Sequence, residues 1–288
     1  MKFLSKLIAA MAAMCAATVA QAYEQTPCPP YEASGEGPDV ILIPGLGSSP
    51  ATWDGVLASL ESDYRVHRVH VAGFAGREPN GPPETILPRA QDEILAYMQC
   101  RQIGSASFVG HSMGGFMSLL IAAEQPDLVE RVVVVDALPF YPLIFNSAAT
   151  VENATAQADV FANQIAAQDD TAFAATQAQT VRALVQSAER QQQVAGWSLA
   201  SDRATFAQAI KALMTTDARP LLGKIDAPTT VIAAHNPYAP ESRVIPLYES
   251  AYAALDGVRI VPVADSYHFV MFDQPEAFAT ALAEALRK

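Results

Sequence analysis

Residues 110–114 read Gly-His-Ser-Met-Gly, and this pentapeptide is the most informative feature of the chain. It follows a short apolar run at 106–109 and precedes a segment with the composition of a helix. When a strand turns abruptly into a helix through small residues, the central side chain is lifted clear of the sheet, and here it carries a hydroxyl. Glycines on both sides let the strained backbone pass its neighbours without collision. The pattern predicts Ser112 as a nucleophile; the alternative is a glycine-rich turn with an incidental serine.

Apolar runs and helical stretches alternate on both sides of this turn. Strands are predicted at 40–43, 64–71, 106–109, 132–135, 229–233 and 258–263, and helices at 53–60, 83–102, 114–124 and 275–286. The run 132–135 consists of consecutive valines, which is typical of a central strand covered on both faces. The alternation indicates an α/β fold, in which helices flank a mostly parallel sheet.

The alternation is interrupted once, by a long segment rich in alanine and glutamine. From about residue 143 to residue 219 the spacing is helical and no strand-like run occurs. We therefore expect an α/β core at 23–138 and 221–288, with residues 139–220 inserted as a helical cap, or lid. An insertion at this point would lie over the carboxyl ends of the strands, where open α/β sheets bind their ligands.

The first 22 residues have the pattern of a cleavable signal peptide. Two lysines precede an apolar stretch at 7–19, and residues 20–22, Ala-Gln-Ala, offer the small side chains that a signal peptidase accepts. The apolar stretch is short for about 30 Å of hydrocarbon, so a stable membrane anchor is not expected. The residues before Cys15 do not match a lipid attachment site. We expect residues 1–22 to be removed and the mature protein to be periplasmic or secreted.

The charge balance and the cysteines limit the partners of the protein. The chain has 30 Asp and Glu against 18 Lys and Arg, which argues against an extended basic patch and a nucleic-acid partner. Cys28 and Cys100 remain after processing; an oxidising compartment would let them form a disulfide, and two separate thiols are the alternative. Histidines and carboxylates do not fall at a recognised metal-ligand spacing, so neither a metal nor a cofactor is expected.

Five segments of the chain resemble the α/β-hydrolase-fold superfamily of enzymes with a helical cap. They occur in the family's order and read Ile43-Pro44-Gly45-Leu46-Gly47, Gly73-Phe74-Ala75-Gly76, Gly110-His111-Ser112-Met113-Gly114-Gly115, Val132 to Asp136, and His268-Phe269 followed by Asp273-Gln274-Pro275-Glu276. The resemblance spans nearly all of the mature chain. It implies a serine hydrolase that works through a Ser-His-acid triad, without a cofactor, on a small acyl substrate.

A serine nucleophile needs a base, and the chain offers five histidines. His268 follows the last predicted strand and matches the catalytic histidine of the family in place and neighbours. His67 and His70 are interpreted as structural or surface residues. His111 adjoins the nucleophile but is expected to point away from it and to pack, and His235 follows the penultimate core strand.

The acid departs from the commonest family pattern. Many relatives carry it in the loop that corresponds to residues 234–238, which here contains no carboxylate. Asp136 ends the preceding core strand, at the position that some lipases and dehalogenases use. We therefore favour Asp136, whose alternative role is to cap a turn. Glu241 is the reserve, and Asp265 and Asp226 are weaker alternatives.

The remaining site predictions concern the oxyanion and the substrate pocket. Two backbone amides, those of Leu46 and Met113, are expected to form the oxyanion hole. An apolar pocket is predicted from Phe74, Leu138, Phe140, Tyr141, Phe145, Trp197 and Met214, although each could instead pack the cap against the core. The predicted function is hydrolysis of a carboxylic ester. Alternatives on the same triad are a lactonase, thioesterase, amidase, carbon-carbon hydrolase or haloperoxidase, and a non-catalytic small-ligand-binding protein remains a further alternative.

Overall fold

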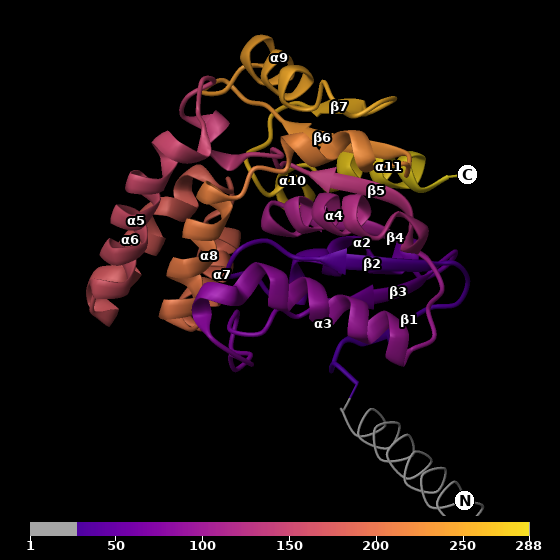
Figure 1. The fold of residues 1–288 in the computed structure, drawn as a ribbon, viewed down its shortest axis with the longest axis horizontal. Helices are drawn as coiled ribbons and strands as arrows, with labels where there is room; N and C mark the ends of the chain where they lie inside the picture. Colours follow the sequence, from indigo (N-terminus) through magenta and orange to yellow (C-terminus); the bar gives the residue numbers. More distant parts are fainter. Residues whose placement is uncertain (1–27, 288) are drawn as a thin grey trace, which may run out of the picture. The chain divides into compact units, whose positions relative to one another are not determined.

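A seven-stranded sheet forms the centre of the molecule in the computed structural model, which describes residues 28–287 (Figure 1). Across the sheet the strands are β1 (Glu32–Ser34), β3 (Arg65–Arg68), β2 (Asp39–Ile43), β4 (Ala106–His111), β5 (Val129–Val135), β6 (Thr229–Ala234) and β7 (Arg259–Val263). The edge strand β1 is antiparallel to β3, and every other pair is parallel. The mostly parallel sheet confirms the predicted fold class. The predicted signal peptide, residues 1–22, lies outside the described residues.

The central strands are buried because their side chains are apolar on both faces. Every residue of β4 and β6 is buried, as are the last four residues of both β2 and β5. Strands β4 and β5 are paired in parallel up to His111 and Val135, and the backbone N–H of Ser112 then donates to the Val135 carbonyl at 2.9 Å. The carboxyl ends of these two strands therefore lie side by side, and the residues that follow them emerge at the same edge of the sheet.

Two groups of core helices pack on the sheet. Helix α2 (Asp54–Leu60) contacts α11 (Pro275–Leu286), and α3 (Ile86–Cys100) contacts α4 (Met113–Glu124). Helix α4 is buried on nearly all sides, which its run of apolar residues allows. Further core helices are η1 (Pro50–Trp53), η2 (Pro83–Thr85), η3 (Pro126–Leu128), η6 (Arg219–Lys224), α9 (Glu241–Ala251) and α10 (Val270–Asp273).

A group of helices between β5 and β6 forms the cap. It contains α5 (Val151–Ala167), α6 (Asp170–Thr180), α7 (Ala188–Leu199) and α8 (Arg203–Thr215), with short turns η4 (Tyr141–Ile144) and η5 (Val181–Ala183). Figure 1 places these helices beyond the carboxyl ends of the strands. Each long cap helix begins with a side chain that accepts a backbone N–H, and these capping residues are Thr150, Asp169, Ser187 and Asp202. The local sequence thus specifies where each cap helix starts.

Main-chain hydrogen bonds join the cap to the core loop that follows β3. The N–H of Gly76 donates to the Ala200 carbonyl at 2.9 Å, and the N–H of Asp202 donates to the Gly73 carbonyl at 2.8 Å. The N–H of Ala75 also donates to the Ser201 hydroxyl, at 2.9 Å. We call residues 73–76 and 200–202 the cap latch. It fixes the α7–α8 corner of the cap to the sheet edge at which the strands end.

The strand predicted at 64–71 is wrong in length, since β3 ends at Arg68. The N–H of Val69 still donates to the Leu42 carbonyl, at 2.9 Å, but the chain then turns toward Gly73, whose φ is +91°. Val69 and Val71 are buried in this turn. The apolar run therefore predicted burial correctly but not strand pairing.

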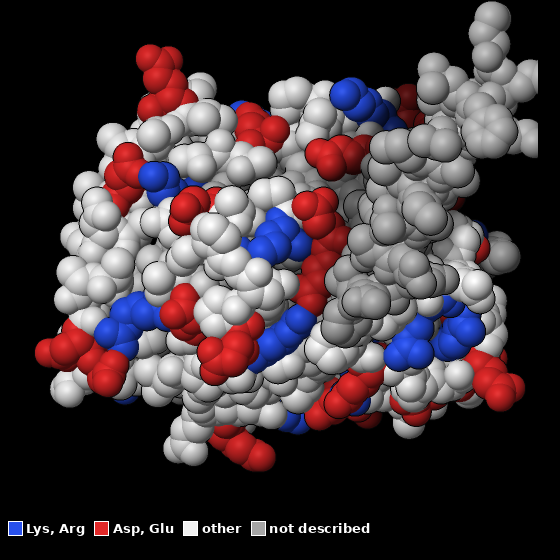
Figure 2. All heavy atoms as spheres, turned by 60° about the horizontal axis from the view of Figure 1, so that its bottom comes forward, with Lys and Arg blue, Asp and Glu red and all other residues white. Residues whose placement is uncertain are grey.

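Acidic and basic side chains are interspersed on the face that Figure 2 shows, and the described part of that face carries no continuous basic area. Several basic side chains are paired with carboxylates, among them Arg203 with Asp170 and Lys211 with Asp159. Among residues 28–287, no helix is long and apolar enough to cross a bilayer.

Candidate active site

Ser112 lies at the sharp turn between β4 and α4. Its backbone has φ 52° and ψ −119°, a conformation that is strained for a residue with a side chain. The turn is held by the hydrogen bond from Ser112 N–H to the Val135 carbonyl. The side chain is half-buried rather than enclosed. Ser112 therefore lies in a strained turn directly after β4, at the edge of the sheet.

The glycines around Ser112 are required by close main-chain contacts. A Cβ atom at Gly110 would lie 2.2 Å from the carbonyl carbon of Gly114, and one at Gly114 would lie 2.1 Å from the carbonyl oxygen of Ile43. Main-chain atoms in a packed sheet cannot move aside cheaply. Both positions therefore need glycine for the turn to form against β2.

His268 and Asp136 meet at the same edge of the sheet. Asp136 directly follows β5, with a φ of 48°, and its N–H donates to the Ile232 carbonyl at 2.8 Å. The Nδ1 atom of His268 lies 2.7 Å from Oδ2 of Asp136. The two side chains are 24% and 15% exposed, so the pair is largely but not wholly shielded from water. Because Nδ1 is held by the carboxylate, Nε2 is the nitrogen left for proton transfer.

The alternative acids lie elsewhere. Glu241 begins α9, is exposed, and lies 3.6 Å from Nε2 of His235. Asp265 and Asp226 are exposed as well. The structure thus brings Asp136 to His268, and pairs the reserve acid with a different histidine.

His111 packs against His268 from below the turn. The two rings lie 4.5 Å apart between centroids, and Nε2 of His111 donates to the His268 carbonyl at 3.0 Å. Burial, together with the charge of His268 when that ring is protonated, holds the pKa of His111 well below its usual value. A neutral His111 avoids repelling an imidazolium at His268. The packing role expected for His111 therefore places it directly beneath the histidine of the site.

The other two histidines have structural partners. His67 is buried, with Nε2 2.7 Å from Oδ1 of Asp39 and Nδ1 2.8 Å from the Tyr97 hydroxyl. His70 is bonded to the Phe74 carbonyl at 2.9 Å. Burial lowers the pKa of both imidazoles. Neither residue contributes to the His268–Asp136 pair.

The turn that carries Leu46 touches the Ser112 turn. A Cβ atom at Gly45 would lie 3.2 Å from Cβ of Ser112 and 2.9 Å from Nδ1 of His111. The Ser48 hydroxyl donates to the Leu46 carbonyl at 3.3 Å, while Ser48 N–H donates to the Gly45 carbonyl at 3.1 Å. Met113 begins α4, where the first amides have no acceptor within the helix. The two predicted oxyanion amides thus belong to segments in direct contact.

The predicted pocket side chains occupy separate packing sites. Phe74 is buried edge-on against Phe206 of α8, with 6.5 Å between ring centroids. The Arg219 guanidinium covers the Phe140 ring at 4.8 Å, and Trp197 packs on Phe272 at 6.2 Å. The other members of the predicted set are Leu138 and Met214, which are buried, and Tyr141, which meets the exposed Phe145 edge-on. The Phe74–Phe206 and Trp197–Phe272 pairs join the core to the cap, and the apolar pocket itself stays a prediction.

Two tyrosines that the sequence analysis missed contact the residues after β5. Tyr248 donates its hydroxyl to Oδ1 of Asp136 at 2.9 Å, and Tyr252 donates to the Ala137 carbonyl at 2.7 Å. Tyr248 lies on α9 and Tyr252 directly follows it, and the sequence analysis did not predict this helix. The signal available was their spacing of four residues, which places both on one face of a helix.

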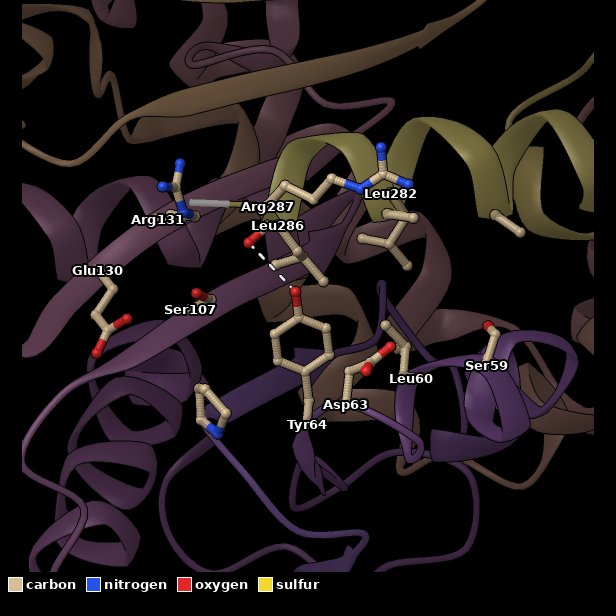
Figure 3. Close-up of a pocket in the computed structure, with 13 residues that line it drawn as sticks. Ser59, Leu60, Asp63, Tyr64, Ser107, Glu130, Arg131, Leu282, Leu286 and Arg287 are labelled. Atoms are coloured by element: carbon tan, nitrogen blue, oxygen red, sulfur yellow. Dashed lines mark hydrogen bonds between the residues drawn. The ribbon is translucent and has the colours of Figure 1, made fainter.

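A hollow of about 480 Å³ lies at the opposite end of the strands (Figure 3). Its lining includes Ser107 and Glu130, at the starts of β4 and β5, and Tyr64, whose hydroxyl points to the Leu286 carbonyl at 3.3 Å. Because Ser112 and Asp136 follow the other ends of the same two strands, this hollow is separate from the site.

Within residues 28–287, no cluster of three His, Cys, Asp or Glu side chains could hold a metal ion. Cys28 and Cys100 are both disulfide-bonded. Their pairing with each other stays a prediction.

Comparison with known proteins agrees with the observed fold. A model of the alpha/beta hydrolase family matches residues 40–281. A pimeloyl-(acyl-carrier protein) methyl ester esterase from Aeromonas hydrophila is 32% identical over 112 residues, which cover 38% of this chain and 42% of that enzyme. An esterase of the same name from Nitrosomonas europaea is 25% identical over 212 residues, covering 71% of this chain and 79% of the enzyme.

Several of the curated relatives are matched over less than half of their length. A solved structure, a hydrolase from Pseudomonas aeruginosa, shares the fold with a TM-score of 0.75 at 23% identity, over 90% of this chain and 94% of its own. The family match covers most of the chain, and the solved structure has the same fold. The chain therefore belongs to the alpha/beta hydrolase family.

Proposed function

We propose that this protein is a serine esterase that cleaves a carboxylic ester through an acyl-enzyme. Ser112 is the nucleophile, His268 the base and Asp136 the residue that orients the base. The observation that carries the proposal is the meeting of three features at one sheet edge. These are a serine in a strained turn, a histidine packed on the residue before that serine, and a carboxylate 2.7 Å from that histidine.

The residues have defined tasks in the reaction. Nε2 of His268 takes the hydroxyl proton as Oγ of Ser112 forms a bond to the ester carbonyl carbon. Asp136 holds the opposite nitrogen and stabilises the imidazolium. As the tetrahedral intermediate collapses, the ester C–O bond breaks and His268 returns the proton to the leaving alcohol. Water, activated by the same histidine, then releases the acid and restores Ser112.

The oxyanion of the intermediate is held by the amides of Leu46 and Met113. Their segments touch at Gly45 and Ser112. The start of α4 adds the positive end of the helix dipole. A single donor of this kind stabilises the transition state by about 3 kcal/mol.

Ester cleavage is favoured over the other reactions of a serine hydrolase because two curated relatives are named methyl ester esterases. We also propose that residues 1–22 direct export and are removed. Disulfide bonding of Cys28 and Cys100 supports this compartment, because disulfides persist where the environment is oxidising. Mass spectrometry of the exported protein checks the cleavage: a first residue at or next to position 23 supports export, and an intact Met1 contradicts it.

The enzyme activity is tested with p-nitrophenyl esters of graded acyl length and the purified mature protein. Ser112→Ala is expected to abolish turnover, and Asp136→Asn to lower kcat by a factor of about a thousand or more, because the amide cannot stabilise the imidazolium. Glu241→Gln is the matched control for Asp136→Asn and should keep full activity. Turnover that survives Ser112→Ala would contradict the proposal.

Labelling with a fluorophosphonate separates an unsuitable substrate from an inactive site. A folded protein that reacts at Ser112 but turns over no ester has the nucleophile, and its substrate is then a lactone, thioester or amide. A folded protein that does neither is a ligand-binding member of the family, which refutes the esterase proposal.

A further inference from the structure

The carboxylate of Asp136 has a second set of contacts besides His268. Its Oδ2 faces His268, while its Oδ1 accepts the Tyr248 hydroxyl at 2.9 Å and the Ala234 N–H at 3.1 Å. Both carboxylate oxygens therefore have partners. The two donors to Oδ1 come from different elements, β6 and α9. Rotating the carboxylate away from His268 would break both.

The environment of Tyr248 keeps its hydroxyl protonated, so that it donates a hydrogen bond to Asp136. Its side chain is 5% exposed, and burial beside Asp136 raises the pKa of the phenol well above its ordinary value, so that the hydroxyl keeps its proton. The Tyr252 ring stacks beside it, with 6.3 Å between centroids and 9° between planes. The pKa of the Tyr252 phenol is raised by the same causes. Two neutral phenols therefore hold consecutive residues of the segment that follows β5.

We propose that Tyr248 is a positioning residue for the candidate triad: its hydroxyl fixes the Asp136 carboxylate so that Oδ2 faces His268, and it takes up part of the carboxylate charge. The inference rests on the proposed function, because it assigns Asp136 to the acid position. Hydrogen bonds between a neutral donor and an ionised acceptor are short and strong, and in a shielded site they are stronger than at the surface.

This bond makes a prediction about the pH dependence of catalysis. The charge that Asp136 shares with Tyr248 is not available to stabilise the imidazolium of His268. The ionisable groups facing the pair are Tyr248 of α9, Tyr252 directly after α9, and His111, whose ring packs on His268; burial holds both phenols and His111 neutral. Removal of the Tyr248 hydroxyl therefore concentrates negative charge beside His268 and favours its protonated form.

The test compares Tyr248→Phe with Tyr252→Phe. Each removes one hydroxyl from one of two stacked rings, but the Tyr252 hydroxyl contacts the Ala137 carbonyl instead of the carboxylate. For Tyr248→Phe we expect kcat to fall about tenfold with little change in KM. The midpoint of the acidic limb of kcat/KM should rise by about half a pH unit. For Tyr252→Phe the midpoint should stay where it is.

A second variant covers the case in which Tyr248→Phe does not fold. Site-specific replacement of Tyr248 by 3,5-difluorotyrosine keeps the ring and strengthens the donor, so the midpoint should move in the opposite direction, to lower pH. A structural role for the ring predicts no such movement. A profile that superimposes on that of the unmodified enzyme, or a change that Tyr252→Phe reproduces, overturns the proposal.

Failure of the esterase proposal is recognised separately. The His268 ring can be titrated by NMR in the Ser112→Ala protein, which needs no turnover, with and without Tyr248→Phe. A midpoint that shifts upward supports the positioning role of Tyr248 even if no ester is a substrate. If the midpoint is unchanged in the Ser112→Ala background while the parent enzyme, with Ser112 intact, reacts with a fluorophosphonate, only the role of Tyr248 is refuted.

Discussion

Replacing Gly47 by alanine tests how closely the cap rests on the turn that carries Leu46. Gly47 has a φ of +62°, and a Cβ atom there would lie 2.5 Å from Cε2 of Phe206 on α8. Phe206 cannot swing aside easily, because it is 5% exposed and lies edge-on between Phe74 and Phe173, at 6.5 Å and 5.7 Å between centroids. The methyl group must therefore displace either the turn or the cap helix.

The cost follows from two contributions. A left-handed backbone disfavours any L side chain by about 1–2 kcal/mol, and overpacking of a dense site adds about 1–3 kcal/mol. We expect Gly47→Ala to lower the free energy of unfolding by about 2–5 kcal/mol. Because displacement of the turn also moves the Leu46 amide, kcat on p-nitrophenyl esters should fall while Ser112 still reacts with a fluorophosphonate.

A double-mutant cycle of Gly47→Ala and Phe206→Leu, followed by urea denaturation, measures the interaction free energy between the new methyl group and the Phe206 ring. Leucine is shorter than phenylalanine, so it removes the collision but not the backbone strain at Gly47. The double variant should be more stable than the sum of the single effects predicts, by about 1–2 kcal/mol. Additive effects, or a cost for Gly47→Ala below about 1 kcal/mol, would refute the reasoning.

Two further predictions concern the turn at Ser112 and the histidine beneath it. Gly114→Ala places Cβ 2.1 Å from the main-chain oxygen of Ile43. We therefore expect the free energy of unfolding, measured by urea denaturation, to fall by more than about 3 kcal/mol, and Ser112 not to be labelled by a fluorophosphonate. Gly55→Ala is the control: its Cβ meets nothing within 4 Å, so the change should be neutral or stabilising. Because the pKa of His111 is depressed in the folded protein, the unfolded chain binds a proton at this histidine first as pH falls. The contribution of neutral His111 to the free energy of unfolding is therefore intact above about pH 6.5. Below that value it is lost, and the free energy of unfolding falls by up to about 1.4 kcal/mol per pH unit. His111→Gln should reduce this slope between about pH 6.5 and pH 5, and an unchanged slope would show that His111 is not the group responsible.

The sequence was informative wherever a local pattern reports directly on burial or strain. The Gly-His-Ser-Met-Gly turn, the valines of β5 and the absence of a carboxylate at 234–238 each pointed to a place at the carboxyl ends of the strands. Ser112, Asp136 and His268 lie there. Such patterns work because the physical demand, a strained turn or a strand covered on both faces, is met by a few consecutive residues.

Other elements depend on contacts that are distant in sequence. Strand β1 is three residues long with mostly exposed side chains, so it has no apolar signal of its own. Helix α9 contains Pro246, a residue that argues against a helix interior. The partner of Tyr248 lies 112 residues away along the chain. The pocket side chains stay a prediction, because aromatic residues that line a cavity and aromatic residues that pack a cap have the same composition.

The cap latch has a consequence for exchanging substrate specificity between members of the family. Its hydrogen bonds join the α7–α8 corner to residues 73–76, and Gly73 is in addition so close to α8 that a Cβ atom there would lie 2.7 Å from Cγ2 of Thr205. If only the insertion were replaced by the cap of a relative, residues 73–76 would have to bond an α7–α8 corner of different sequence and shape. A chimera should therefore exchange two separate segments together, residues 69–77 and residues 139–220, although they are far apart in the sequence.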